Sequence, residues 1–435
     1  MKQTMKYYSL NGTAPAVDFR TAVINGQAPD KGLYFPGTVP VLDADFWEGI
    51  GRYDDHAIAR RIILPYAGDS IPEAELARIV EETLSFPVPL RPVSESMHVL
   101  ELFHGPTLAF KDVGARFMSR CLSWFARGLD GRVVVLVATS GDTGGAVAAA
   151  FHGVPYVDVV VLYPKGRVSP VQEAQIAGAG DNVHALEVAG TFDDCQALVK
   201  QAFADTNLRE ALYLTSANSI NVARWLPQQF YYALAWKQWP RKDRPPVLSV
   251  PSGNFGNIGA ALLLHRSGLP VQQFVAACNA NDGVARLLAG TPGERRAAIA
   301  TLSNAMDVAD PSNFVRILEL FGGDTAALRQ MLRVTTTTDD QTREAIRAVY
   351  ERFGYVLDPH SAVAWHGLQQ GLPPGEHGIL VGTAHPVKFP GVVAEETGAP
   401  VPYPPAIAGL MERPLQKEPL AVSYDALRTR LLALR

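Results

Sequence analysis

The chain has 435 residues and a net charge of −4, from 39 Lys and Arg and 43 Asp and Glu residues. This near balance argues against a general nucleic-acid-binding surface. Apolar residues make up 47% of the chain and charged residues 19%, which excludes a mostly disordered protein.

The chain carries no signal for a membrane or an oxidising compartment. Cys121, Cys195 and Cys278 lie far apart and form no CxxC motif, so neither a disulfide framework nor a zinc site is expected. No histidine spacing is typical of a catalytic metal. The amino terminus lacks the apolar core of a signal peptide, and no apolar run reaches the ~20 residues that span a bilayer. We therefore expect a cytoplasmic protein that binds neither membrane nor nucleic acid.

Residues 1–95 differ from the rest of the chain. They contain turn signals and no strong alternation of strands and helices. Apolar residues between Pro72 and Leu84 recur on one helical face, which predicts an amphipathic helix. We predict a separate N-terminal domain over residues 1–95.

From residue 100 the pattern becomes that of an α/β protein. Short β-branched runs alternate with stretches rich in Ala, Leu and Gln, which is typical of a mainly parallel sheet covered on both faces. Two open sheet domains are predicted, over residues 96–235 and 236–435. The expected strands are 133–137, 157–162, 183–188, 247–250, 274–277 and 379–381, and the expected helices include 113–126, 193–203, 221–236 and 256–265.

Lys111 lies in an unusual setting just before the first of these helices. It follows the apolar run 108–110, which ends in Phe110. Most lysines are solvated surface residues, so a lone lysine carries little information. A partly apolar setting would, however, lower the pKa of the amine, which suits the formation of a Schiff base.

Two predicted strands run into glycine-rich loops that open helices. Free N–H groups at a helix N-terminus and nearby hydroxyls suit a carboxylate or a phosphate, although each loop alone could be an ordinary turn. Neither loop has the GxGxxG or GxxxxGK[ST] pattern, so a dinucleotide or a nucleoside triphosphate is disfavoured. The first loop contains Thr139, Ser140, Gly141, Asp142 and Thr143, and the second contains Ser252, Gly253, Asn254, Phe255, Gly256 and Asn257.

Two further features lie near the carboxyl end of the chain. Thr338 and Gln341 have the spacing of a capping box, and the helix they begin should end near Gly354. Thr383 and His385 follow the last predicted strand, at the edge where open α/β sheets bind ligands.

One cofactor would explain these features together. Pyridoxal phosphate needs an amine partner, a phosphate cradle, a partner for its ring nitrogen and a clamp for the substrate carboxylate. Lys111, the loop 252–257, Thr383 and the loop 140–144 offer one of each. The sequence therefore predicts an enzyme that uses pyridoxal 5'-phosphate.

Longer stretches resemble the threonine synthase family, in the longer form typical of enterobacteria and fungi. The matching motifs are 100–112, 139–144, 216–221, 250–257 and 382–386, in the expected order. The resemblance implies the type II fold of pyridoxal phosphate enzymes, similar to the tryptophan synthase β group. It implies conversion of O-phospho-L-homoserine and water to L-threonine and phosphate, the last step of threonine synthesis. Residues after about 390 match weakly, and nothing is carried over from them.

The resemblance also implies roles for individual residues. Lys111 matches the lysine that carries the cofactor, and Thr383 matches the hydroxyl beside the pyridine nitrogen. Phe110 is expected to pack on the cofactor ring. The loop 252–257 is expected to bind the cofactor phosphate, and the loop 139–143 the substrate carboxylate. The candidates for the substrate phosphate are Arg116, Arg224, Lys165 and Arg167, with His104 and Lys388 behind them.

Two alternatives stay open at this point. A different lyase of the same fold, such as a dehydratase, would release a 2-oxo acid. A non-catalytic protein could keep the cofactor as a sensor, although an intact Lys111 and two complete loops weigh against it. The sequence does not indicate an oligomeric state.

Overall fold

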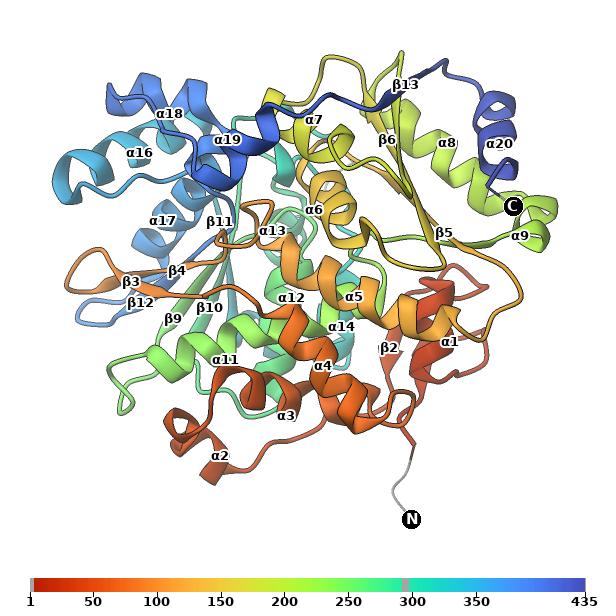
Figure 1. Cartoon of the computed structure of the whole chain (residues 1–435). Helices are drawn as coiled ribbons and strands as arrows, with labels where there is room; N and C mark the ends of the chain where they lie inside the picture. The colour runs from red at the N-terminus through yellow and green to blue at the C-terminus, as the bar shows by residue number, and fades with distance from the viewer. Residues whose placement is uncertain (1–3, 292–296, 435) are drawn as a thin grey trace.

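Two open sheets of mainly parallel strands carry the fold (Figure 1). The computed structural model describes residues 4–291 and 297–434. Every expected strand is confirmed, with ends that differ by no more than two residues. The six-stranded sheet has the order β11 (Leu332–Thr336), β10 (Gln273–Cys278), β9 (Val247–Pro251), β12 (Gly378–Gly382), β4 (Met97–Glu101) and β3 (Leu90–Pro92), and the five-stranded sheet has the order β13 (Lys417–Leu420), β7 (Val183–Val188), β6 (Val157–Pro164), β5 (Val133–Ala138) and β8 (Tyr213–Thr215).

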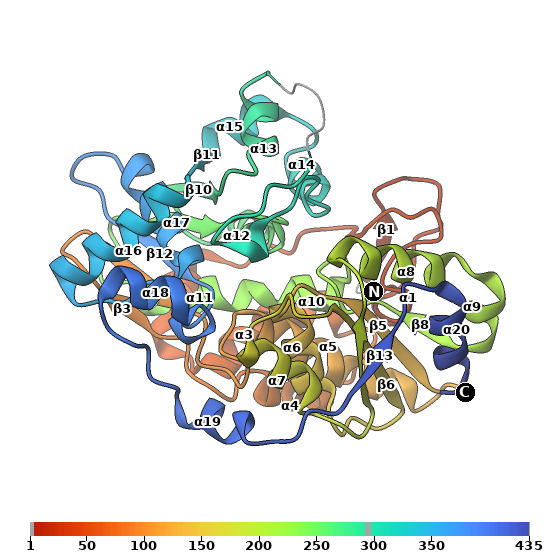
Figure 2. The same ribbon diagram turned by 90° about the horizontal axis from the view of Figure 1, so that it is seen from above.

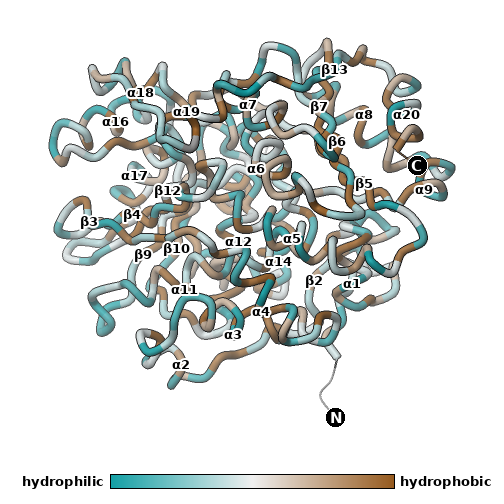
Figure 3. The backbone as a smooth tube through the Cα atoms, viewed as in Figure 1, coloured by the Kyte–Doolittle hydropathy of each residue, from teal (hydrophilic) through white to brown (hydrophobic). Residues whose placement is uncertain are grey.

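The five-stranded sheet is covered on both faces, which explains why its central strands β5 and β6 are largely apolar. All residues of β5 and β6 are buried, and both strands are largely hydrophobic in Figure 3. Alternate residues of β5 face opposite ways, so Val133, Val135 and Val137 join one buried cluster and Val134 and Leu136 join another. The helices on this sheet are α6 (Asp142–Phe151), α7 (Pro170–Ala177), α8 (Phe192–Ala204), α9 (Thr206–Ala211) and α20 (Tyr424–Leu432).

The six-stranded sheet is built in the same way. Val275 and Ala277 of β10 pack in a cluster with α17, whereas Phe274 and Ala276 face the larger core with α12. The strands are parallel except for β3, which pairs antiparallel with β4. The helices of this half are α12 (Gly256–Arg266), α13 (Gly283–Leu288), α14 (Phe314–Leu320), α15 (Thr325–Met331), α16 (Asp339–Phe353), α17 (Pro359–Gly371) and α18 (Pro390–Thr397), with single 3-10 turns η3 (Asn304–Met306) and η4 (Pro386–Lys388).

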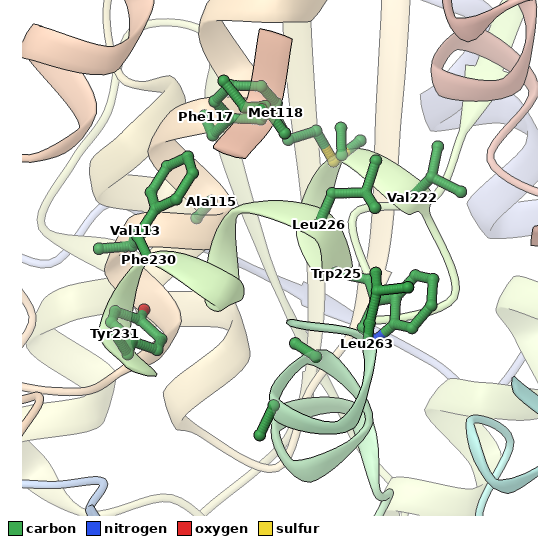
Figure 4. Close-up of a cluster of buried hydrophobic side chains, with 14 of the residues drawn as sticks. Val113, Ala115, Phe117, Met118, Val222, Trp225, Leu226, Phe230, Tyr231 and Leu263 are labelled. Atoms are coloured by element: carbon green, nitrogen blue, oxygen red, sulfur yellow. The ribbon is translucent and has the colours of Figure 1, made fainter. Parts of the chain in front are cut away.

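Helices between the two sheets form a common core. They are α5 (Lys111–Ala126), α10 (Val222–Trp225), η2 (Leu226–Gln228) and α11 (Gln229–Gln238). The single helix expected over 221–236 is interrupted at η2, where Pro227 cannot donate a helical hydrogen bond. Figure 4 shows how Phe117 and Met118 of α5 approach the side chains of η2 and α11, and the rings of Phe117 and Phe230 lie 6.4 Å apart. No helix in the described ranges is long and apolar enough to cross a bilayer.

The N-terminal segment packs into this common core. Its amphipathic stretch forms α4 (Glu73–Thr83), as predicted. The ring of Phe19 contacts Phe125 of α5, with centroids 6.1 Å apart. The division of the chain at residues 95 and 235 stays a prediction. β3 and β4, on either side of residue 95, belong to the same sheet, and residue 235 lies inside α11. The other elements of this segment are β1 (Tyr7–Ser9), α1 (Phe19–Asn25), β2 (Tyr34–Pro36), α2 (Ala44–Glu48), η1 (Ile50–Arg52) and α3 (Asp55–Ala67).

The carboxyl end of the chain crosses from one sheet to the other. Figure 2 shows the segment leaving α18, passing through α19 (Pro405–Met411) and ending in β13 and α20. β13 adds a parallel edge strand to β7 of the five-stranded sheet. On the other side, β3 and β4 precede α5 in the chain and yet belong to the six-stranded sheet. Both sheets are therefore completed by strands from distant parts of the sequence.

The predicted capping box at α16 forms as expected and allows a stability test. The Thr338 hydroxyl accepts from the Gln341 N–H, the Gln341 side chain accepts from the Thr338 N–H, and Gly354 ends the helix in a left-handed conformation. We expect Thr338→Ala to lower the free energy of unfolding by about 1 kcal/mol in urea denaturation. Thr325→Ala, at an exposed position in α15 that caps nothing, is the control and should stay within about 0.5 kcal/mol of the parent.

Candidate active site

The site forms where the carboxyl ends of strands from both sheets approach one another. The segment after β4 pairs with the segment after β12 through backbone hydrogen bonds. Phe110 N donates to Thr383 O at 2.9 Å, and His385 N donates to Leu108 O at 3.0 Å. These bonds place Lys111, the first residue of α5, beside Thr383. The Thr383 hydroxyl has no hydrogen-bond partner among the described residues.

Lys111 has the environment of a reactive amine. Its Nζ forms no hydrogen bond or ion pair with the described residues, and it lies 5.8 Å from the centroid of the Phe110 ring. Burial lowers the pKa of Lys111 to about 8; the charge of Asp142 opposes this shift, and those of Lys388 and Arg224 add to it. Near physiological pH the amine is therefore still mostly protonated, but it is neutral in a far larger fraction than an ordinary lysine.

The loop 252–257 is shaped to hold an anion. Phe255 adopts a left-handed conformation with φ 58°, and α12 begins after it with no side-chain cap, which leaves the N–H groups of its first turn available. The Asn257 side chain accepts a hydrogen bond from the Tyr232 hydroxyl, whereas its own Nδ2 is buried without a partner. A Cβ at Gly253 would lie 2.4 Å from Met306 Cα, so only glycine fits there. The free N–H groups of the first turn of α12 and Asn257 Nδ2 could donate hydrogen bonds to a phosphate group.

Two side chains of this loop brace it and are not free to bind a ligand. Asn254 Nδ2 donates to Ser219 Oγ at 2.9 Å, and Asn254 Oδ1 accepts from the backbone N–H and the hydroxyl of Ser312. The Ser252 hydroxyl donates to Val250 O at 2.8 Å. The backbone and Asn257 therefore offer the donors of this cradle.

The loop 139–143 forms a second cradle on the other sheet. Gly141, the N-cap residue of α6, has φ 140°, which disfavours a side chain, and it offers no side-chain cap of its own. The Thr139 hydroxyl oxygen accepts from the N–H groups of Gly141 and Gly144, at 3.0 and 2.9 Å, and so shapes the loop itself. The hydroxyls of Ser140 and Thr143 have no partner among the described residues. These two hydroxyls are available to a ligand.

Asp142, in the same loop, is engaged in a buried ion pair. Lys388 Nζ lies 2.7 Å from Asp142 Oδ1, and the side chains are 0% and 6% exposed. Lys388 also donates to Thr107 O at 3.0 Å. Burial opposes ionisation of Asp142, but Lys388, followed by Lys111, holds the pKa of its carboxyl well below the usual range. The sequence pointed to each residue separately and did not indicate that they pair.

Among the predicted cations, the structure distinguishes Arg224. Its side chain is buried near Lys111, Nη1 donates to Ala217 O, and Nε has no partner. No carboxylate of the described residues forms an ion pair with it, and burial lowers the pKa of Arg224 to about 10. Arg116 instead binds Glu82 O and Ser85 Oγ, which ties α5 to the end of α4.

The remaining predicted cations lie away from this arrangement or are engaged. Lys165 and Arg167 are exposed on the turn after β6. His104 Nε2 is bound to Glu101 at 2.7 Å. Of the six candidate cations, Arg224 and Lys388 are the two that lie near Lys111.

Sequence reasoning missed a buried cation behind the phosphate-type cradle. Arg316 donates to the carbonyls of Ser219, Ile220 and Tyr34, and its guanidinium lies 4.5 Å from the centroid of the Trp225 ring. Burial lowers the pKa of Arg316 to about 9. The one signal available was an arginine within the apolar run Phe314–Leu320. Its bonds hold the segment that braces Asn254.

Comparison with known proteins places the whole chain among characterised relatives. Family models described as pyridoxal-phosphate dependent enzyme, threonine synthase N terminus and threonine synthase C-terminal match residues 93–382, 6–84 and 361–429. The threonine synthase of Serratia marcescens is 43% identical, covering 99% of this chain and 100% of that protein. The last of the three models covers the segment after residue 390, where the motifs alone supported no assignment.

Solved structures agree with these relatives. The crystal structure of threonine synthase from Escherichia coli matches with a TM-score of 0.91 at 42% identity, covering 99% of this chain and 100% of that one. A pyridoxal phosphate-bound threonine synthase from Brucella melitensis matches with a TM-score of 0.94 at 36% identity, covering 99% of both chains.

The close approach at Gly253 yields a test of the cradle. Gly253→Ala should force the loop away from Met306, and we expect at least about a tenfold loss of affinity for pyridoxal phosphate, measured by equilibrium binding. Gly51→Ala is the matched control, because a Cβ at Gly51 meets no atom within 4 Å. If the two variants bind pyridoxal phosphate with equal affinity, the loop is not part of the cofactor-binding site.

Proposed function

Because the chain belongs to the threonine synthase family, we propose that it converts O-phospho-L-homoserine and water to L-threonine and phosphate, by γ-elimination and β-addition of water. The family accounts for the type II fold and for dependence on pyridoxal phosphate, and it assigns the chain to the last step of threonine biosynthesis. The observation that carries the site assignment is the position of Lys111, an unpaired amine beside Thr383.

The residues present can hold the cofactor at both ends. We assign its phosphate to the backbone of residues 253–257 and to Asn257 Nδ2, which has no hydrogen-bond partner within residues 4–291 and 297–434. We assign its ring nitrogen to the free Thr383 hydroxyl, and one ring face to Phe110. When bound, pyridoxal phosphate supplies an aldehyde for an amine and a ring that withdraws electrons from the attached carbon.

Lys111 is assigned the proton transfers. With a pKa of about 8, its amine can take up a proton and release it near physiological pH without a large energetic penalty. The Tyr231 hydroxyl donates to Phe110 O and fixes the backbone that carries Lys111. One amine on a fixed backbone can therefore serve successive carbon atoms of a bound substrate.

The two anionic ends of the substrate are assigned to different elements. The N-terminus of α6, with the hydroxyls of Ser140 and Thr143, suits the carboxylate. Arg224 suits the phosphate, because its buried guanidinium has no carboxylate partner among the described residues and a phosphate would compensate its charge. This separation would place the chain of the substrate along Lys111.

Product analysis with O-phospho-L-homoserine tests the proposal. L-threonine and phosphate in equal amounts are expected, whereas 2-oxobutyrate without threonine would indicate a dehydratase or phospho-lyase of the same fold. The cytoplasmic location expected from the sequence stays a prediction.

Lys111→Ala should abolish threonine formation and the visible band of the cofactor–lysine linkage, because the other lysine near the site, Lys388, is held in an ion pair with Asp142. Absorbance spectroscopy and the threonine assay measure the two effects on one sample. Lys417→Ala, which removes an ion-paired lysine on β13, is the control and should retain both. An unchanged visible band in Lys111→Ala would refute the assignment of the amine.

Arg224→Gln should raise the KM for O-phospho-L-homoserine by about a hundredfold, since a hydrogen bond to a charged group contributes about 1.5–3 kcal/mol. The absorbance of the bound cofactor should stay unchanged, because Arg224 is assigned to the substrate. Arg352→Gln, at an exposed position on α16, is the control. A KM within twofold of that of the parent would show that Arg224 does not bind the substrate phosphate.

A further inference from the structure

The buried Asp142–Lys388 pair lies close enough to Lys111 to affect its charge. Asp142 and Lys388 act on Lys111 in opposite directions, with the effect of Asp142 the larger. Because the two charges lie 2.7 Å apart, Lys388 offsets part of that effect. The pair also joins the halves of the site, since Asp142 begins α6 and Lys388 lies in η4 after β12. Neither position is needed to cap a helix.

Lys388 is held in place by several partners. Besides Asp142, it donates to Thr107 O, which also accepts from Gln175 Nε2 at 3.0 Å. Asp142 Oδ1 also accepts from Gln172 Nε2 at 3.0 Å. The pair is thus fixed by the hydrogen bond that Asp142 accepts from α7 and by the one that Lys388 donates to the segment before α5.

Of the ionisable groups around Lys111, this pair is the one whose change should most affect the protonation of the Lys111 amine. Asp112 is neighbouring in sequence, but its carboxylate accepts from the N–H and hydroxyl of Thr107. Tyr231 is bound to Phe110 O, and burial raises its pKa, so it stays neutral. Arg224 remains cationic, and His385 Nδ1 accepts from Val387 N. Without Lys388, Asp142 would face the Lys111 ammonium as an uncompensated carboxylate.

We propose that Lys388 is a positioning residue that neutralises Asp142, and thereby keeps Asp142 from holding Lys111 in its protonated form. The proposal rests on the proposed function, because it assigns Lys111 as the amine that attacks the cofactor aldehyde. Only the neutral amine can bond to the aldehyde carbon, and the aldehyde oxygen then leaves as water with the two hydrogens of the amine. The pair would therefore control how readily the cofactor is captured.

The test measures how fast the full chain, freed of cofactor, takes up pyridoxal phosphate at a series of pH values. The bond to residue 111 is trapped by borohydride and quantified by mass spectrometry. In Lys388→Met, the pH midpoint of uptake should rise by about one unit or more. At pH 7 the uptake rate should then fall about tenfold.

Matched variants separate charge from structure. Lys388→Met combined with Asp142→Asn removes both charges, and its midpoint should return toward that of the unaltered chain. Lys388→Arg keeps the charge and should keep the midpoint. If Lys388→Met does not fold, Lys388→Gln replaces it, because the amide can still donate to Thr107 O. A structural role alone would lower the extent of uptake and leave the midpoint where it was.

The outcomes also distinguish this proposal from the one on which it rests. An unshifted midpoint in the single variant, or a double variant no closer to the parent, overturns the role of Lys388 while leaving Lys111 as the cofactor lysine. Absence of any bond at residue 111 in the unaltered chain overturns the assignment of Lys111 itself.

Discussion

The backbone pairing between residues 108–110 and 383–385 is the constraint on which the site depends. It joins the segment after β4 to the segment after β12 and sets Lys111 at the start of α5. Every other part of the site is arranged around that fixed point: the cradle at α12, the cradle at α6 and the hydroxyl of Thr383. Since backbone atoms make these bonds, the side chains in the segments remain free for chemistry.

Three buried cationic side chains in and around the site differ in the groups that compensate their charge. Lys388 has a carboxylate partner and Arg316 has carbonyl oxygens. Arg224 has one carbonyl, an unpaired Nε and no carboxylate among the described residues. An isolated buried cation costs free energy, and an anionic ligand removes much of that cost. This contrast, more than the number of basic residues, is the reason we propose that Arg224, and not Arg316, binds the substrate phosphate.

Much of the fold and of the candidate site could be predicted from the sequence, because apolar strands and glycine-rich turns are recognised from short stretches of residues. β5, β6, β9, β10 and β12 each contain a largely apolar run, β7 is partly apolar, and the capping box of α16 is a short-range pattern. β4, β8 and β13 were not predicted, since Met97–Glu101, Tyr213–Thr215 and Lys417–Leu420 are short and include polar or proline residues. The Asp142–Lys388 pair and the burial of Arg316 depend on contacts between distant segments, which spacing along the chain cannot reveal.

The order in which the strands are made has a consequence for biosynthesis of the protein itself. β12 lies between β9 and β4 in the middle of its sheet, and β13 supplies the edge of the other sheet, yet both come from the last quarter of the chain. A growing polypeptide therefore carries a gap in one sheet and an unprotected border on the other until translation is nearly finished. Because Thr383, which we assign to the cofactor, follows β12, the proposed cofactor site can be complete only after residue 383 has been synthesised.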